Sequence, residues 1–432
     1  MEGMLKTGSR ITSESGNSYT VNKMLGSGGQ GEVYEVTGNN GKKALKWYYK
    51  STSSKEQKSI IMDLVQDGAP SKNFLWPEDF ITDMTNGTFG YIMDLRPGEY
   101  KNIPDLLNRK TDPSFEILIK SIFNMAKEYE ALHSKGYSYK DISDQNVFFN
   151  PKNGSVLICD NDNVSINGMQ DSGVYGTMRF MAPEIVRGEA TPSRNTDLYS
   201  LAVLIFNMLF ISHPLEGTNE YKIHALDDNA NKALFGTHPV FIYDPNNPEN
   251  RPVQGFHDNA IIYWSLYPEF LKQKFIKAFT DGIRNPAARV VEHEWKEVSI
   301  KLLDSLMICP SCGAEVFYDE AKETTGENHV CWNCKSVLRV PPKMKLGKHT
   351  ILLDVGRKLK SHHLNNDYDM DTDVAEVNQN PNNPGQLGLK NMTTDTWVYI
   401  RPDGTQSMLP PGRSAALAPG VTIDFGKNKG QM

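Results

Sequence analysis

Residues 139–150 read YKDISDQNVFFN and hold two side chains suited to metal-dependent acid–base chemistry. Asp141 and Asn146 follow a helical pattern and precede an apolar strand. The Asp141 carboxylate can accept a hydroxyl proton, and the Asn146 carbonyl can bind a magnesium ion. Further on, LICDND places Asp160 after a second apolar strand, where a carboxylate can chelate a metal that bridges phosphates. Each acid taken alone is equally compatible with a turn residue or a helix cap.

Upstream of this loop lie a glycine-rich turn and a lysine in an apolar setting. The segment LGSGGQGEV carries Gly26, Gly28 and Gly31 in GxGxxGxV spacing. Missing side chains let backbone N–H groups approach phosphate oxygens, although glycine-rich hairpins without that role are common. Lys46 in ALKWY follows Val33 by thirteen residues. A lysine buried in a strand needs a charged or polar partner, and a snorkelling surface lysine is the alternative.

These elements occur in the order of the protein kinase signature. The ordered set is Gly26, Gly28, Gly31, Lys46, Asp141, Asn146, Asp160 and Ala182-Pro183-Glu184. On these residues, the chain from about Ser9 to Leu306 resembles the bacterial eukaryotic-like Ser/Thr protein kinase family. Asp197 and Arg289 resemble the family's buried helix Asp and the late Arg that pairs with Glu184.

The resemblance implies an α+β fold of two lobes. The first, at about residues 9–94, would be small and rich in strands, and the second, at about 95–306, would be mainly helical. The sequence agrees, because residues 10–50 alternate short β-type runs with Gly and Asn turns. After Pro113, apolar residues recur at three-to-four spacing, which is typical of helices.

The resemblance also implies roles for individual residues. Asp141 would orient and deprotonate the acceptor, Lys46 would hold the phosphates of ATP, and Asn146 with Asp160 would hold Mg²⁺ or Mn²⁺. Gly176-Thr177 would lie on the substrate-facing loop, which in this family usually goes with Ser or Thr acceptors. The adenine-binding and hinge positions are Val33, Ala44, Met93, Asp94, Leu95 and Phe148.

Several positions depart from the family pattern. Tyr139 and Lys140 replace the usual His and Arg before the catalytic Asp, and Ser143 replaces the lysine that contacts the γ phosphate. The DFG triplet reads DND, so Asn161 replaces the Phe. These departures leave a pseudokinase scaffold as an alternative function, although the phosphate-binding and metal-binding side chains are retained.

The carboxylate partner of Lys46 is expected on a helix at Ser54 to Asp67. A capping box of Ser53 with Glu56 would open this helix. Glu56 and Asp63 share a helical face, and Asp63 lies nearer the middle of the helix. We therefore predict Asp63 or Glu56 as the partner, with a preference for Asp63.

Composition and charge indicate a folded cytoplasmic protein. The chain is 39% hydrophobic and 23% charged, and its net charge of -6 gives no reason to expect nucleic acid as a partner. The N-terminus lacks the apolar core of a signal peptide, and the longest apolar run, Leu198 to Ile211, is too short to span a bilayer. We expect no membrane attachment.

Four of the five cysteines form two CxxC pairs, Cys309 with Cys312 and Cys331 with Cys334. Eighteen residues separate the pairs, which matches the spacing of a zinc ribbon at residues 307–340. Four thiolates would close a tetrahedral site and leave no position for water, so the predicted Zn²⁺ is structural.

Residues 345–432 alternate short β-type runs with Gly, Pro and Asn clusters, which predicts an all-β sandwich. The Asn/Pro-rich stretch 378–385 predicts a long loop. SHHL at 361–364 and the turns near the C-terminus resemble a forkhead-associated (FHA) domain. That resemblance implies phosphopeptide binding through Arg357 and Ser361, and a sandwich used only for packing or docking is the alternative.

The predicted reaction is phosphoryl transfer from ATP to a protein Ser or Thr, with the C-terminal modules acting in recruitment. Bacterial kinases with an appended zinc ribbon resemble those encoded beside a von Willebrand A-type protein and a metal-dependent phosphatase. These two proteins are therefore the expected partners. A nucleic-acid-binding role for the ribbon is disfavoured, because EVFYDEAKETTGENH between the cysteine pairs is acidic.

Overall fold

The computed structural model describes residues 3–83, 87–168 and 176–432. The chain divides into two compact units, one of residues 1–265 and 272–296, the other of residues 266–271 and 297–432. Among the described residues, no helix combines the length and the apolar character needed to cross a membrane.

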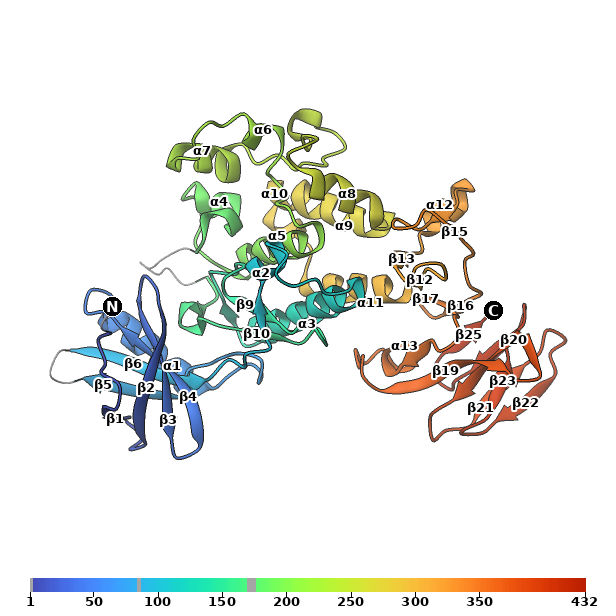
Figure 1. Ribbon diagram of the computed structural model, residues 1–432, viewed down its shortest axis with the longest axis horizontal. Coiled ribbons are helices and arrows are strands. Elements are labelled where there is room, and N and C mark those ends of the chain that lie inside the picture. Colours follow the sequence, from blue (N-terminus) through green and yellow to red (C-terminus); the bar gives the residue numbers. More distant parts are fainter. Residues whose placement is uncertain (1–2, 84–86, 169–175) are drawn as a thin grey trace. The chain divides into compact units, whose positions relative to one another are not determined.

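A six-stranded antiparallel sheet forms the N-terminal part of the first unit (Figure 1). Its order is β1-β2-β3-β4-β6-β5, and α1 lies beside it. The bounds are β1 (Arg10–Thr12), β2 (Ser18–Ser27), β3 (Gly31–Gly38), β4 (Gly41–Tyr48), α1 (Lys55–Asp67), β5 (Asp79–Asp83) and β6 (Thr88–Asp94). The register places Lys46 of β4 between Val33 of β3 and Tyr91 of β6. This lysine therefore lies in the middle of the sheet.

The rest of the first unit is mainly helical, as predicted. Its helices are α2 (Ile103–Leu107), α3 (Phe115–Ser134), α4 (Pro183–Val186), α5 (Arg194–Phe210), α6 (Thr218–Tyr221), α7 (Asp228–Lys232) and α10 (Asp281–Arg284), together with most of α8 (Asp258–Leu266) and α9 (Glu269–Phe279) and the start of α11 (Glu292–Asp304). The helix α5 is buried along most of its length, which fits its nearly unbroken apolar sequence.

Short strands adjoin the predicted catalytic loop, which is residues 139–146. They are β7 (Lys101–Asn102), β8 (Tyr137–Ser138), β9 (Val147–Phe149), β10 (Val156–Ile158) and β11 (Ser165–Ile166). The strands β9 and β10 pair antiparallel, with Val147 opposite Ile158. Because Asn146 precedes β9 and Asp160 follows β10, this pairing brings the two predicted metal ligands to the same end of the hairpin.

The second unit contains two small hairpins and two larger antiparallel sheets. The hairpin strands are β12 (Leu306–Ile308) with β13 (Glu315–Phe317), and β14 (His329–Val330) with β15 (Val337–Leu338), and α12 (Glu320–Thr325) lies between them in sequence. The sheet orders are β17-β16-β25-β24-β21-β22 and β18-β19-β20-β23. Both sheets contribute to one hydrophobic core that includes Leu346, Leu359, Leu389, Trp397 and Ile423.

The bounds in the sheets are β16 (Lys343–Leu346), β17 (His349–Leu352), β18 (Lys358–Lys360), α13 (Ser361–Asn365), β19 (Asp373–Asn380), β20 (Asn383–Asn391), β21 (Trp397–Ile400), β22 (Gln406–Leu409), β23 (Ser414–Ala416), β24 (Thr422–Asp424) and β25 (Lys429–Gln431). The long loop predicted at 378–385 is wrong. The strands β19 and β20 extend through it to pair Asn380 with Asn383, and the Asn380 side chain accepts the backbone N–H of Asn382. An Asn/Pro-rich segment can therefore close a tight hairpin.

The two units divide within α11, between residues 296 and 297, and not near Leu306. The last turns of α11 belong to the second unit because their side chains pack there. Asp304, for example, contacts His363 of α13.

Candidate active site

The backbone of the catalytic loop is held by a buried carboxylate. Asp197 of α5, 1% exposed, accepts hydrogen bonds from the backbone N–H of Tyr139 at 2.6 Å and of Lys140 at 3.1 Å. Lys140 has a φ of 69°, a left-handed conformation that is unfavourable for a residue with a side chain. The two hydrogen bonds to Asp197 help to maintain that conformation, which sets the position of Asp141.

The Asp141 carboxylate is oriented from two sides. Asn146 Nδ2 donates to Asp141 Oδ2 and to the Asp141 carbonyl, both at 2.9 Å. Thr177 donates to Asp141 Oδ1 through its backbone N–H at 2.9 Å and its hydroxyl at 3.0 Å. With its amide nitrogen used in this way, Asn146 can offer its carbonyl oxygen to a cation.

The predicted substrate-facing segment reaches the catalytic loop at Gly176. Its φ is +102°, and a Cβ atom there would lie 2.7 Å from the Lys140 carbonyl oxygen. A side chain would clash with the backbone, so only glycine fits this close approach. The residues just before it, 169–175, lie outside the described part of the chain.

Lys46 is buried and paired, as a lysine in the middle of a sheet must be. It is 5% exposed, and its Nζ lies 2.8 and 3.0 Å from the two carboxylate oxygens of Asp162. Gln30 Oε1 is 3.0 Å away and Asp160 Oδ1 is 3.6 Å away. Burial acts to lower the pKa of Lys46, but attraction by Asp162 and Asp160 outweighs burial and raises the pKa. Lys46 is therefore a stable cation.

Asp162 belongs to the candidate active site, and sequence reasoning missed it. Its carboxylate accepts hydrogen bonds from the Tyr48 hydroxyl and, at 3.2 Å, from the Tyr91 hydroxyl. Burial acts to raise the pKa of Asp162, but Lys46 and these donors outweigh burial and lower it. The fully buried carboxylate thus stays ionised between a cation and two phenols.

The predicted partners of Lys46, Asp63 and Glu56, are wrong. Both side chains are exposed, and in the described structure neither contacts Lys46. The helix N-cap is Ser54, whose hydroxyl accepts the backbone N–H of Gln57, and not Ser53. With the helix starting after Ser54, Gln57 lies on the side of α1 that faces Asp162, and its side chain donates to the Asp162 carbonyl at 3.1 Å.

Near the end of the β9–β10 hairpin, Asp160 and Asn146 offer oxygen atoms that would suit a divalent cation. Burial raises the pKa of Asp160, and the charges of Asp162 and Asp141 raise it further against the opposing effect of Lys46. Carboxylate and amide oxygens are the ligands that Mg²⁺ prefers, so Asp160 and Asn146 fit the predicted metal. A bound cation would relieve the repulsion between Asp160 and the other carboxylates.

The predicted adenine-binding residues gather in one apolar cluster. Ala44 and Met93 belong to its buried part, and Val33, Leu95 and Phe148 pack against it. Asp94, the other hinge position, is exposed and pairs with Lys43 at 2.7 Å.

The glycine-rich turn between β2 and β3 has Gly26 and Gly28 exposed with open space around them. Its third glycine, Gly31, faces Trp47, where an added Cβ would lie 2.1 Å from a carbonyl oxygen.

Comparison with known proteins identifies the family of this chain. The protein-family profile described as "Protein kinase domain" matches residues 19–254, more than half of the chain. The chain belongs to the protein kinase domain family. This match confirms the protein kinase predicted from the sequence.

Several curated kinases are similar. Protein kinase YegI of Escherichia coli (strain K12) is 24% identical over 413 residues, which cover 86% of this chain and 62% of YegI. The probable serine/threonine-protein kinases CCRP1 of Zea mays and CPE1738 of Clostridium perfringens are 27% and 24% identical over 46% and 47% of this chain, and over 32% and 30% of their own lengths. The chain thus spans less than two thirds of each of these relatives.

Within the first unit, Glu184 and Arg289 form the expected ion pair at 2.8 Å. Arg289, 3% exposed, also donates to the carbonyl oxygens of Asn195 and Gly282. This guanidinium joins the segment after the substrate-facing loop to α5 and to α10.

The departures from the kinase pattern have structural counterparts. Asn161 is fully buried and donates to the carbonyl oxygens of Leu75 at 2.9 Å and Ile158 at 3.0 Å. Tyr139 is also fully buried, and its hydroxyl donates to the Cys159 carbonyl. Asn161 therefore holds the DND triplet by hydrogen bonds, whereas a Phe would hold it by apolar packing.

A buried histidine in the kinase domain carries a charge that should affect stability. His133 Nε2 lies 3.0 Å from Asp197, and His133 Nδ1 contacts Glu292, which also pairs with Arg194 at 2.7 Å. Burial acts to lower the pKa of His133, but its hydrogen bonds to the two carboxylates raise it to about 9.

We expect the free energy of unfolding contributed by His133 to depend on pH. Because its folded pKa is raised, the contribution is fully present below its ordinary pKa of 6.5 and is lost as the pH rises through about 9. The whole effect is on the order of 3 kcal/mol. Urea unfolding of the parent and His133→Gln should show a stability difference that shrinks between pH 6.5 and 9.5. A difference independent of pH would contradict the charged His133.

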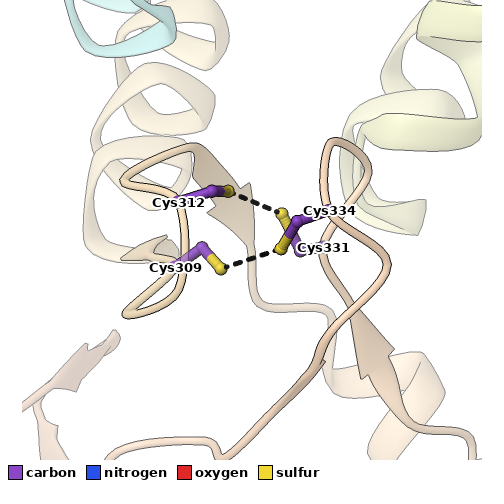
Figure 2. Close-up of side chains that lie close together, drawn as sticks. All are labelled: Cys309, Cys312, Cys331 and Cys334. Carbon is purple, nitrogen blue, oxygen red and sulfur yellow. Dashed lines mark hydrogen bonds between the residues drawn. The ribbon is translucent and has the colours of Figure 1, made fainter.

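The four cysteines of the second unit face one another from two loops (Figure 2). Cys309 Sγ lies 3.6 Å from Cys334 Sγ, and Cys312 Sγ lies 3.6 Å from Cys331 Sγ. Thiolates 2.3 Å from a tetrahedral zinc are about 3.8 Å apart, so the spacing fits one ion and is too long for disulfides.

The two cysteine loops share a backbone design. Gly313 and Lys335, which follow the second cysteine of each pair, both have positive φ, and their N–H groups donate to the carbonyls of Cys309 and Cys331. Hydrogen bonding to Ser336 lowers the pKa of Cys334 to about 6, which favours the thiolate that zinc binds.

The two residues predicted to bind phosphothreonine already have protein partners. Arg357 donates to the Leu306 carbonyl and to Asp354 at 3.2 Å. Ser361 is 6% exposed, and its hydroxyl donates to Asp367 at 2.6 Å. The Asp367 carboxylate would repel a phosphate at this position, so the described arrangement does not favour phosphopeptide binding.

Proposed function

We propose that this chain transfers the γ-phosphoryl group of ATP to Ser or Thr hydroxyls of proteins. The observation that supports this most is the Asp141 carboxylate, which accepts hydrogen bonds at Oδ2 from Asn146 of the predicted catalytic loop and at Oδ1 from Thr177 of the predicted substrate-facing segment. A carboxylate oriented in this way can accept the proton of a hydroxyl that attacks a phosphoryl group. The names of two relatives, both probable serine/threonine-protein kinases, support the choice of acceptor.

The other residues have roles that follow from their charge and position. Lys46, kept cationic by Asp162, would bind the phosphates of ATP. Asp160 and Asn146 would hold Mg²⁺, which would neutralise the charge of the phosphates when bound. The apolar cluster around Ala44 and Met93 would bind adenine.

A radiolabelled ATP assay on the full chain tests this function. We expect label on Ser or Thr of the chain itself or of a generic protein substrate. Absence of transfer, with ATP binding retained, would instead indicate the pseudokinase scaffold.

We propose further that residues 307–340 form a zinc ribbon and that residues 345–432 form an FHA-like β-sandwich used for recruitment. The spacing of the four Sγ atoms supports the first proposal. The order of the two antiparallel sheets around one core supports the second. A von Willebrand A-type protein and a metal-dependent phosphatase as partners, and a cytoplasmic location, stay predictions.

The cysteine site should account for one equivalent of zinc per chain. Replacing Cys309 and Cys331 together by Ser removes one ligand from each loop, and we expect this variant to lose that equivalent. Metal analysis of protein purified without chelators provides the measurement. Cys159→Ser is a suitable control, because that half-buried thiol lies in the other unit. Unchanged zinc content in the double variant would contradict the ribbon.

A further inference from the structure

The second unit holds a buried cluster of one carboxylate and three imidazoles. Asp304 ends α11, His349 begins β17, and His362 and His363 lie on α13. Their exposed fractions are 7%, 7%, 3% and 3%. The proposed phosphoryl transfer uses none of these residues. Burying so many titratable side chains is costly unless each has a partner.

Three of these residues converge at the spacing of metal ligands. The ligand atoms of Asp304, His362 and His363 all lie within 4.8 Å of one another. His363 Nε2 is 2.9 Å from Asp304 Oδ1, and the rings of His362 and His363 are 3.8 Å apart between centroids. Two ligands 2.1 Å from a tetrahedral zinc lie about 3.4 Å apart, so small side-chain shifts would bring the three onto one ion.

Two side-chain atoms of these residues are buried and make no hydrogen bond in the described structure. They are His362 Nε2 and Asp304 Oδ2. The other ring nitrogen of His362, Nδ1, lies 3.3 Å from the Asp369 carbonyl and can only donate to it. That contact leaves a lone pair on Nε2, as second-shell carbonyls do for metal-binding histidines.

We propose that Asp304, His362 and His363 bind a divalent transition-metal ion, for which zinc is the best match. Nitrogen and oxygen donors in this ratio suit zinc. A metal would satisfy His362 Nε2, which makes no hydrogen bond, and would add a second contact to Asp304 Oδ2. His349 acts as a positioning residue, since its Nδ1 lies 3.4 Å from Asp304 Oδ2.

The site has an access route and a structural role. A cavity of about 410 Å³ is lined by Asp304 and His349 among others, so an ion can reach the carboxylate from that side. The ion would join the end of α11, near residue 304, to α13, almost sixty residues later. Bound metal would therefore stabilise the fold of the second unit by linking distant segments.

Metal analysis of the full chain tests the proposal with zinc alone. We expect two zinc equivalents in the parent. The variant with Cys309→Ser and Cys331→Ser should retain one, and so should the variant with His362→Gln and His363→Gln. The control is His238→Gln, because His238 is an exposed histidine of the first unit that pairs with Glu249. This control should keep both equivalents.

Cobalt substitution identifies which site is lost. After zinc removal and refilling with Co²⁺, the cysteine variant should show ligand-field absorption without the thiolate charge-transfer band. The histidine variant should keep that band. A parent with a single zinc, together with a cysteine variant that shows no cobalt absorption, would overturn the proposal.

Asp304→Asn provides a test that does not depend on removing a histidine. Asn has nearly the same shape and can still bond to His363, so the fold should be kept, but it is a poorer metal ligand. We expect the affinity of the second zinc, measured by chelator competition, to fall at least tenfold. Equal affinity in this variant and the parent would also overturn the proposal.

Discussion

Asp141→Asn is expected to abolish phosphoryl transfer while leaving the affinity for ATP within a few fold. The substitution keeps the size of the side chain, and Asn Oδ1 can still accept the hydrogen bonds from Thr177. The variant lacks the base that takes the proton from the substrate hydroxyl, and losing such a base lowers the rate by about 10²- to 10⁴-fold. Initial rates with labelled ATP, and nucleotide binding followed by fluorescence, separate the two effects.

Asp144→Asn is a useful control for Asp141→Asn, because Asp144 lies on the same loop and has no contact with Thr177 among the described residues. It should change the rate far less. If Asp141→Asn keeps the parent's rate, Asp141 has no part in the reaction.

Asp162→Asn should also have a large effect, because it should lower both kcat/KM for ATP and the melting temperature of the protein. The variant leaves the buried Lys46 cation with only Gln30 and the more distant Asp160. Removing one partner of a buried ion pair typically costs about 3 to 5 kcal/mol. We expect kcat/KM for ATP to fall by roughly 100-fold, together with a lower melting temperature.

The matched controls for Asp162→Asn are Asp63→Asn and Glu56→Gln on the exposed face of α1. Both should leave kcat/KM and melting temperature close to those of the parent. A strong loss of activity in Asp63→Asn, combined with a mild effect of Asp162→Asn, would show that α1 supplies the partner of Lys46 in the working enzyme.

The sequence was sufficient to predict the kinase fold because the motif residues follow one another in a fixed order along the chain. Asp141, Asn146 and Asp160 flank the short strands β9 and β10, so their proximity follows from a local hairpin. The four cysteines were equally predictable, because each CxxC turn is local and only the meeting of two such turns is long-range.

The partner of Lys46 was not predicted because it depends on the phase of α1 and on a contact across 116 residues. The sequence held a usable signal for the phase. Gln57, Ile61 and Leu64 are spaced i, i+4, i+7, and the two apolar residues among them are buried. Glu56 and Asp63 must then lie on another side of the helix. Asp162, the last residue of the DND triplet, is left as the candidate carboxylate for Lys46.

The histidine cluster was missed for a different reason. Its members come from residues 304, 349, 362 and 363, with no spacing typical of a metal motif. In the sequence, the pair His362-His363 resembles part of an FHA-like pattern. Only the packing of α13 against the end of α11 brings these residues to Asp304.

The most direct test of the central claim is phosphoamino-acid analysis after incubating the purified full chain with γ-labelled ATP and Mg²⁺. The account predicts labelled phosphoserine or phosphothreonine with the parent and none above background with Asp141→Asn. No label with the parent, when its binding of ATP is intact, would contradict the account and identify the chain as a pseudokinase.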